Sequence, residues 1–240
     1  MFQIVNREEF MKVLVACEES QTVTKEFRKI GHEAYSCDIQ ECSGGHPEWH
    51  IQQDIMPLLN GNCNFNTCDG MAHKIEGEWD LIIAHPPCTY LTHAATQCHS
   101  LKCFPLEYIN NRTIERIEAM HFFLKIANAK CEKIAIENPT GVMNTCYRKP
   151  DQTIEPWYFA ENENDKENYH TKRTHLWLKG LTPLYYDLSR ISPKENKECW
   201  GNGKRKNWTE NNHGSKTRSK TFPGIAKAIA EQWGNVSNSK

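Results

Sequence analysis

Several features common in secreted and membrane proteins are missing from this 240-residue sequence. It contains no run of 18 apolar residues, so a membrane-spanning helix is not expected. No positively charged segment followed by an apolar core opens the chain, so no secretory signal is expected and the predicted location is the cytoplasm. The eleven cysteines are odd in number and do not follow a disulfide framework, which favours free thiols in a reducing compartment.

The net charge of −1 predicts no particular partner, but the charge is uneven along the chain. Between residues 194 and 220 there are eight Lys or Arg side chains against three Glu. Apolar residues are scarce there, so we expect a basic, mobile surface segment over 192–220 rather than a packed element. The cations, with Trp200 and Trp208 between them, favour phosphate contacts and base stacking.

Short apolar runs alternate with amphipathic segments, which predicts alternating strands and helices. Strands separated by helices favour an α/β fold with a parallel sheet, right-handed crossovers and helices on both faces. We place one such domain at 11–191, an extension expected to be disordered at 1–10, and a returning helix within 221–240. The predicted strands are 12–17, 33–38, 49–54, 80–84, 133–137 and 173–178, the helices 22–30, 113–129 and 225–233, and the loops 60–79 and 162–168.

Two of the predicted strands end in turns that carry reactive side chains. Cys88 follows the strand at 80–84, and Glu137 ends the strand at 133–137, 49 residues after Cys88. If these strands are neighbours, the thiol and the carboxylate converge at the edge where open α/β sheets bind ligands. A nucleophile beside an acid suits attack on an electron-poor ring.

Prolines make these two turns more informative than an isolated cysteine or carboxylate. Pro86 and Pro87 fix the backbone before Cys88, and Pro139 keeps the preceding residue extended, which would aim Glu137. A helix starting after Cys88 would lower the pKa of its thiol. The plainer alternatives are a cysteine that serves as a small hydrophobic residue and a glutamate that caps a loop.

The first predicted strand also ends in a polar turn, which suits a nucleoside-type cofactor. Asp38, at the end of the second strand, lies where an acidic residue of a nucleotide-binding βαβ unit holds the ribose hydroxyls. The turn has no GxG pattern, which argues against a pyrophosphate there but not against S-adenosylmethionine. The alternative is that Glu18, Glu19 and Ser20 only cap the next helix. The candidate cofactor-binding residues of the turn are Cys17, Glu18, Ser20 and Thr22.

Together these residues resemble the motifs of the cytosine-C5 DNA methyltransferases, most closely the short phage-encoded members of that superfamily. Pro87-Cys88 resembles the Pro-Cys nucleophile motif, and Glu137-Asn138 resembles the Glu-Asn-Val motif. The further matches are Asp38 at the ribose, Asp54 at the adenine, Lys172-Arg173 in an Arg-bearing strand motif, and 218–226 in the C-terminal motif that completes the cofactor pocket. The resemblance covers most of residues 11–234 and implies a Rossmann-like methyltransferase sheet that binds S-adenosylmethionine.

The resemblance also implies a mechanism and a partner. Cys88 would add to C6 of cytosine, Glu137 would hydrogen-bond or protonate N3, and C5 would take the methyl group. The base must be flipped out of duplex DNA or be single-stranded. Arg173 would hold the base edge or a neighbouring phosphate. The protein is expected to be a monomer. The other implied contacts are Pro86 at the cofactor, and Pro87, Asn138, Lys172, Lys204, Arg205, Lys206 and Arg218 at the DNA.

Three departures from the family pattern keep other functions open. Residues 16–22 replace the Gly-rich first motif, Thr89 stands where the family has Gln, and only 47 residues separate Arg173 from Thr221, far fewer than the family's target recognition domain. Relaxed sequence specificity is therefore expected. The alternatives are a pyrimidine-modifying transferase acting on a nucleotide or RNA, and an inactive nucleic-acid-binding protein of the same fold.

Two sets of cysteines and histidines have spacings that zinc would tolerate. They are Cys63 and Cys68 with His73, and Cys98 and Cys103 with His93 and His99. Neither contains the tight Cys-x2-Cys pairs of a zinc ribbon, so no metal site is predicted.

Overall fold

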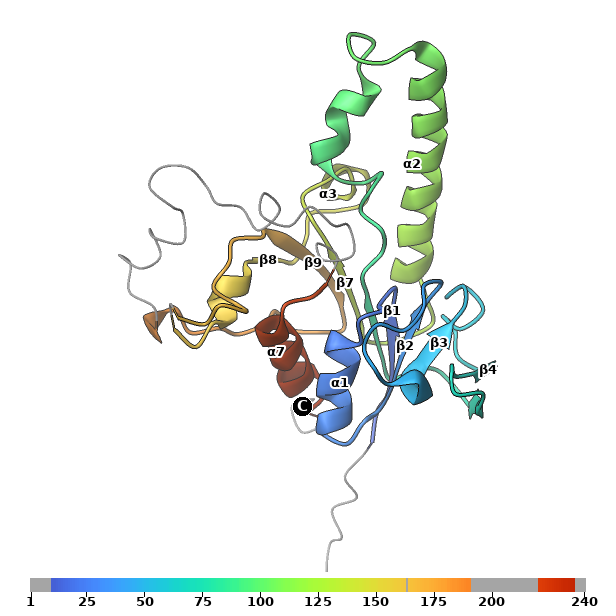
Figure 1. The fold of residues 1–240 in the computed structure, drawn as a ribbon, viewed down its shortest axis with the longest axis vertical. Coiled ribbons are helices and arrows are strands. Elements are labelled where there is room, and N and C mark those ends of the chain that lie inside the picture. The colour runs from blue at the N-terminus through green and yellow to red at the C-terminus, as the bar shows by residue number, and fades with distance from the viewer. Residues whose placement is uncertain (1–9, 163, 191–219, 236–240) are drawn as a thin grey trace, which may run out of the picture.

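A seven-stranded, mostly parallel sheet forms the centre of the protein in a computed structural model that describes residues 10–162, 164–190 and 220–235 (Figure 1). The strand order is β3-β2-β1-β6-β7-β9-β8. The first five are parallel to one another, and β9 runs antiparallel to both β7 and β8. The strands are β1 (Lys12–Ala16), β2 (Glu33–Asp38), β3 (His50–Gln52), β6 (Leu81–Ala84), β7 (Ile134–Asn138), β8 (Gln152–Ile154) and β9 (Thr174–Lys179).

Helices cover both faces of this sheet, which confirms the predicted α/β class. On one face α1 (Thr22–Lys29) and α7 (Pro223–Trp233) lie side by side (Figure 1). On the other face lies α2 (Leu106–Ala127). The residues of β1 alternate between the two cores: Val13 packs with α1 and α7, whereas Leu14 packs with α2. Strands buried on both faces need continuous apolar runs, which is why the central strands were recognisable in the sequence.

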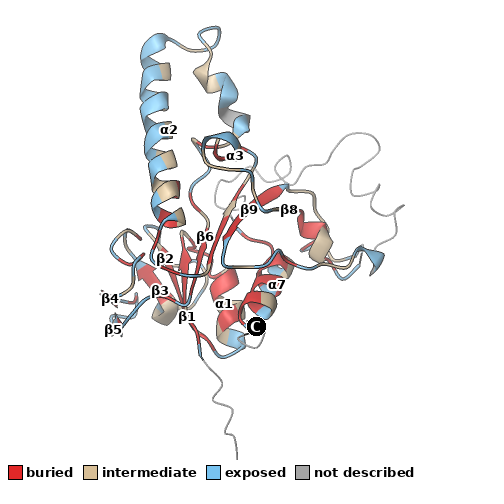
Figure 2. Ribbon diagram, turned by 180° about the vertical axis from the view of Figure 1, so that it is seen from behind, coloured by how far each residue is buried: buried red, intermediate tan, exposed pale blue. Residues whose placement is uncertain are grey.

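Helix α2 begins seven residues before its predicted start at 113 and packs over only part of its length. Its buried residues are Phe123 and Ile126, near the C-terminal end. Ile114 and Ile117, on the face expected to be apolar and packed, are 56% and 48% exposed. Figure 2 shows the N-terminal half of α2 extending past the sheet with exposed residues around it.

The segment 60–79, predicted to be a loop, contains a separate two-stranded antiparallel hairpin of β4 (Cys63–Asn66) and β5 (Ala72–Ile75). Cys63 and Phe65 are buried while the Asn residues between and after them are exposed, so the strand alternates with period two. Two apolar residues, Cys63 and Phe65, among polar ones are too few to predict a strand from the sequence. The strand predicted at 49–54 is shorter than expected, because η1 (Pro47–Trp49) precedes the three residues of β3.

The remaining elements are short. They are η2 (His93–His99), α3 (Met143–Cys146), η3 (Pro156–Phe159) and η4 (Leu188–Arg190). Among the described helices, not one combines the length and apolar character needed to cross a bilayer. Except for Phe10 and Lys220, the predicted extension at 1–10 and the basic segment at 192–220 lie outside the described residues.

Candidate functional site

The parallel strands bring the predicted reactive residues to one edge of the sheet. β6 and β7 are paired neighbours, with Ala84 opposite Ile136. Glu137 is the next residue of β7, and Cys88 lies four residues beyond the end of β6. Both therefore lie at the carboxyl edge of the sheet, which is where open α/β folds bind ligands.

Cys88 is exposed and lies in a tight turn. Its carbonyl oxygen accepts hydrogen bonds from the backbone N–H groups of Leu91 (3.0 Å) and Thr92 (2.9 Å). The next helical turn, η2, begins only at His93. The helix N-terminus that the sequence suggested as a means of lowering the pKa of Cys88 therefore does not directly follow the thiol.

Two arginines of α2 hold the residues that follow Cys88. Arg112 donates from Nη2 to the carbonyl oxygen of Thr89 (3.1 Å), and its guanidinium lies 4.7 Å from the centre of the Tyr90 ring. Arg116 donates from Nε to the carbonyl oxygen of Tyr90 (2.9 Å). The sequence did not indicate these residues, because two arginines on a long helix are usually solvent-exposed. They give the projecting half of α2 a contact with the candidate site.

The turn after β6 is also tied to the turn after β7. Asn138 donates from Nδ2 to the carbonyl oxygen of Pro86 (2.7 Å) and is buried. Val142 donates its backbone N–H to the carbonyl oxygen of Leu91 (2.8 Å). Position 141, just before Val142, requires glycine, since a Cβ there would lie 2.1 Å from the carbonyl oxygen of Leu91. Asn138 thus supports the Cys88 turn, and its contact with substrate stays a prediction.

Glu137 lies in a largely buried polar cluster with His85, a residue that the sequence analysis did not indicate. Its Oε2 is 3.2 Å from Nδ1 of His85 and accepts a 3.5 Å hydrogen bond from the hydroxyl of Thr221. Burial alone would raise the pKa of Glu137, but contact with His85, the charges of His85 and Lys172, and the Thr221 hydroxyl outweigh burial and lower it. Glu137 is therefore held as a carboxylate when His85 carries a proton.

The turn after β1 has an unusual backbone for a segment without glycine. Cys17 and Gln21 have φ angles of 60° and 58°, in the left-handed region where glycine is usually preferred. Glu18 is buried and caps α1, accepting hydrogen bonds from the backbone N–H groups of Val23 (2.6 Å) and Thr24 (3.2 Å). This is the capping alternative weighed from the sequence. Cofactor contact by Glu18 stays a prediction, as it does for Ser20 and Thr22, whose hydroxyls are 3.1 Å apart.

A cavity of about 250 Å³ lies between this turn and the Cys88 turn. Asp38 and Asp54 both line it, and each accepts at Oδ1 a hydrogen bond from the backbone N–H two residues later, which fixes the carboxylates. Burial, with the nearby charge of Asp38, raises the pKa of Cys17, so this thiol stays neutral. The cavity lining includes Cys17, Asp38, Ile39, Asp54, Pro87 and Tyr90.

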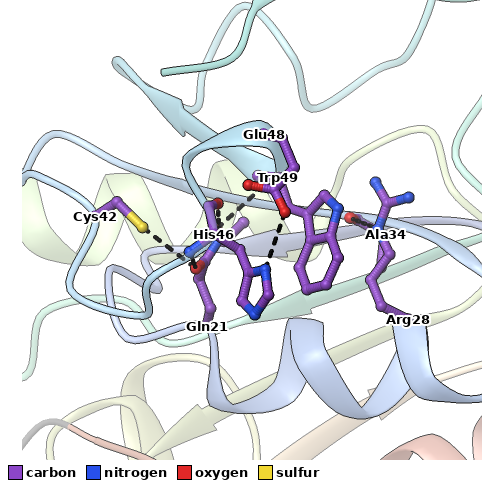
Figure 3. A network of polar contacts seen from close by, with 8 residues as sticks. Gln21, Arg28, Ala34, Cys42, His46, Glu48 and Trp49 are labelled. Carbon is purple, nitrogen blue, oxygen red and sulfur yellow. Dashed lines mark hydrogen bonds and ion pairs between the residues drawn. The ribbon is translucent and has the colours of Figure 1, made fainter. Parts of the chain in front are cut away.

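The loop after Asp38 is tied to the start of α1 by Gln21, as Figure 3 shows. The side chain of Gln21 donates to the carbonyl oxygen of His46 (2.8 Å) and accepts from the backbone N–H of the same residue (3.0 Å). Cys42 adds a contact to Oε1 of Gln21 (3.2 Å), and the His46 ring stacks on Trp49 with 3.9 Å between ring centres. Gln21 therefore stabilises the loop that leads away from the cavity-lining Asp38 and Ile39.

The cations predicted for the substrate lie in different surroundings. Arg173 is 58% exposed, and its Nε lies 3.8 Å from Oε1 of Glu155. The charge of Lys172 acts on Glu137, and its Nζ lies 5.5 Å from the centre of the Phe222 ring. The other predicted cations, Lys204, Arg205, Lys206 and Arg218, lie outside the described residues.

Neither cysteine–histidine set weighed as a zinc site forms one. Within the three described ranges, no group of three or more His, Cys, Asp or Glu side chains is arranged to hold a metal ion. His73 instead contacts the hydroxyls of Tyr35 and Thr67, both at 3.0 Å. The ten cysteines of these ranges form no disulfide.

Comparison with known proteins adds no assignment. No protein-family model matches the sequence, and no curated protein shows significant similarity to it.

Proposed function

We propose that this protein is an S-adenosylmethionine-dependent methyltransferase that modifies C5 of cytosine in DNA through a covalent adduct with Cys88. One observation carries the proposal. The cavity lined by Asp38 and Asp54 is also lined by Pro87, the residue directly before the exposed Cys88. A cofactor bound between the two carboxylates would therefore lie next to the candidate nucleophile.

The residues around the cavity fit the nucleoside part of this cofactor. Asp38 ends the second strand of a βαβ unit, the position from which a carboxylate holds ribose hydroxyls. Ile39 follows it and is 76% exposed, so its side chain is available to cover the face of an adenine ring. Asp54 would accept a hydrogen bond from the adenine. The cavity volume lies just below the range of about 300–1,000 Å³ for small-molecule pockets, which suits part of the cofactor rather than all of it.

Bound cofactor would supply an electrophilic methyl group, and the protein's own residues would make cytosine reactive. The Cys88 thiolate adds to C6 of the ring. Glu137 donates a proton or hydrogen bond to N3, so that the ring accepts the electron pair and C5 becomes nucleophilic. After methylation, loss of the C5 proton and departure of the thiolate restore the aromatic ring.

Attack by Cys88 requires a flipped or single-stranded base, because the target atom of a cytosine stacked in a duplex is out of reach of the enzyme. Lys172 and Arg173, just before β9, add positive charge on the side of the site opposite the cofactor cavity in strand order. They are suited to phosphate contacts from the DNA backbone.

The test is covalent trapping on DNA that contains 5-fluorocytosine, in the presence of S-adenosylmethionine. The wild type should form an adduct that survives denaturant, and Cys88→Ser should form none. Cys68→Ser, which changes another exposed cysteine in the β4–β5 hairpin region, should behave like the wild type. Mass spectrometry of nucleosides from treated DNA should detect 5-methylcytosine.

The same assays separate the alternatives. Parallel reactions with RNA and with free cytidine nucleotides would identify a different pyrimidine substrate. DNA binding without any adduct or methylated product would indicate an inactive binding protein and would contradict the proposal.

A further inference from the structure

His85 contacts Glu137, the candidate acid. It follows the last residue of β6, and its backbone N–H donates to the carbonyl oxygen of Ala16 (2.9 Å), which extends the pairing of β6 with β1. Its side chain is 10% exposed and that of Glu137 is 11% exposed. Nδ1 of His85 lies 3.2 Å from Oε2 of Glu137, within ion-pair distance although not aligned as a regular hydrogen bond.

The charged groups around His85 come from three directions. Glu137 faces it from β7, Glu18 acts on it from the turn after β1, and Lys172, just before β9, opposes these two carboxylates. Nε2 of His85 is fully buried and has no hydrogen-bond partner among the described residues. A buried ring nitrogen without a hydrogen-bond partner costs free energy, and a purely structural role for His85 would not explain why this cost is tolerated.

We propose that His85 is a positioning residue that stores the proton used by Glu137, so that the buried pair holds one proton which moves between Nδ1 and Oε2 during the reaction. This inference rests on the proposed function. It gives His85 a role that no spacing in the sequence indicates, since the partner carboxylate lies 52 residues away. It also explains how a carboxylate held in its ionised form can act as an acid.

As the Sγ–C6 bond forms, the C5=C6 electron pair shifts to C4–C5 and the C4=N3 pair shifts to N3. N3 takes a proton from Glu137, which takes the Nδ1 proton of His85. Once C5 carries the methyl group, the C5 proton leaves to water and the Sγ–C6 bond breaks. The N3 proton returns to Glu137 and then to His85, so the pair ends as it began.

The electrostatics support this arrangement. Burial alone would lower the pKa of His85, but contact with Glu137 and the charges of Glu137 and Glu18 outweigh burial and raise it. The raised pKa of His85 and the lowered pKa of Glu137 both favour an imidazolium paired with a carboxylate over a neutral pair. A raised pKa means that the stored proton is present at low pH and is lost as the pH rises through the folded-state pKa of His85.

The first measurement does not depend on turnover. In isotope-labelled full-length protein, NMR titration should give His85 a pKa above its usual value of about 6.5, and Glu137→Gln should lower that pKa by at least one unit. A neutral His85 ring at pH 7, or a pKa unchanged in Glu137→Gln, would overturn the proposal.

The second measurement uses His85→Asn, whose side-chain nitrogen stands close to the position of Nδ1 but cannot carry a mobile proton. At pH 8 the rate of adduct formation on 5-fluorocytosine DNA should fall at least tenfold, with unchanged binding of S-adenosylhomocysteine. The alkaline limb of the pH profile should move to lower pH by at least one unit, because Glu137 must then hold its own proton.

The control is His32→Asn, which replaces a buried histidine that is bonded to Met11 and Gly234, away from the site. It should keep the wild-type pH profile. A wild-type profile in His85→Asn would refute the proton store while leaving the proposed function standing. If wild-type protein forms no adduct at all, both proposals fail together, even where the titration finds the ion pair.

Discussion

Asn138 donates its side-chain N–H to the carbonyl oxygen of Pro86 at 2.7 Å, and this bond joins the ends of two neighbouring strands. One strand carries Glu137 and the other leads to Cys88. The separation of acid and nucleophile therefore depends on a buried hydrogen bond that can be removed by a single substitution.

Asn138→Ala should loosen the Cys88 turn and leave the Pro86 carbonyl oxygen buried without a partner. Loss of a buried partner costs about 1–3 kcal/mol of unfolding free energy. Denaturant unfolding should show this loss, and adduct formation should slow at least tenfold at a temperature where the variant is folded. Asn128→Ala removes a bond of the same type and length at the exposed end of α2 and should cost much less. Equal effects of the two substitutions would show that the Asn138 bond has no special part in the site.

The central strands and the reactive turns could be predicted from the sequence for a shared physical reason. Parallel strands covered on both faces must be apolar throughout, so β1, β6 and β7 stand out from their surroundings. Each ends abruptly at polar residues, which made Cys88 and Glu137 recognisable. The alternation of strands and helices then placed their ends at one edge.

The residues that support the site could not be predicted in this way. Arg116 and His85 act through partners 26 and 52 residues away, at Tyr90 and Glu137, and no local pattern encodes such distances. The polar alternation of the β4–β5 hairpin concealed two strands. In α2, the periodic apolar face predicted packing, but Ile114 and Ile117 lie in the half of the helix that extends past the sheet and are exposed (Figure 2).

Asp38→Ala should weaken binding of S-adenosylhomocysteine at least tenfold. A hydrogen bond to a charged group contributes about 1.5–3 kcal/mol, and the substitution would remove it from the ribose hydroxyls. Calorimetry measures the change directly. Asp69→Ala, at an exposed aspartate beyond the end of β4, should bind like the wild type. Unchanged affinity in Asp38→Ala would exclude the cavity as the nucleoside site.

Arg116→Gln should slow adduct formation without weakening cofactor binding. The guanidinium Nε fixes the carbonyl oxygen of Tyr90, two residues after Cys88, and glutamine cannot span the same distance. We expect a decrease in kcat of at least fivefold with the affinity for S-adenosylhomocysteine unchanged, since the bond holds the backbone of Tyr90, whereas Asp38 and Asp54, which would hold the nucleoside, belong to other segments of the cavity lining. Lys125→Ala on the same helix is the matched control, and a full rate in Arg116→Gln would show that the Arg116 bond does not order this turn.

We predict from the sequence alone that the basic segment over 192–220 binds the DNA backbone. Except for Lys220, its residues lie outside the described ranges. Replacing Lys204, Arg205 and Lys206 by Ala should weaken DNA binding to a similar degree for all sequences, since phosphate contacts carry no sequence information. The slope of log affinity against log salt should flatten by up to about 0.9 per lost phosphate contact. Fluorescence anisotropy over a salt series measures both effects.

A matched control separates this segment from a general loss of positive charge. Changing Lys74, Lys130 and Lys227 to Ala removes three exposed cations from the hairpin, the end of α2 and α7. Because none of them lies at the carboxyl edge of the sheet, this variant should keep the wild-type salt slope. If the substitutions at 204–206 leave binding and methylation unchanged at every salt concentration, the segment is a loop without a role in DNA binding.

The expected sequence specificity is relaxed, because a segment of fewer than thirty residues poor in apolar side chains cannot form a recognition domain with its own core. A bisulfite map with one long, strictly defined site would refute this expectation.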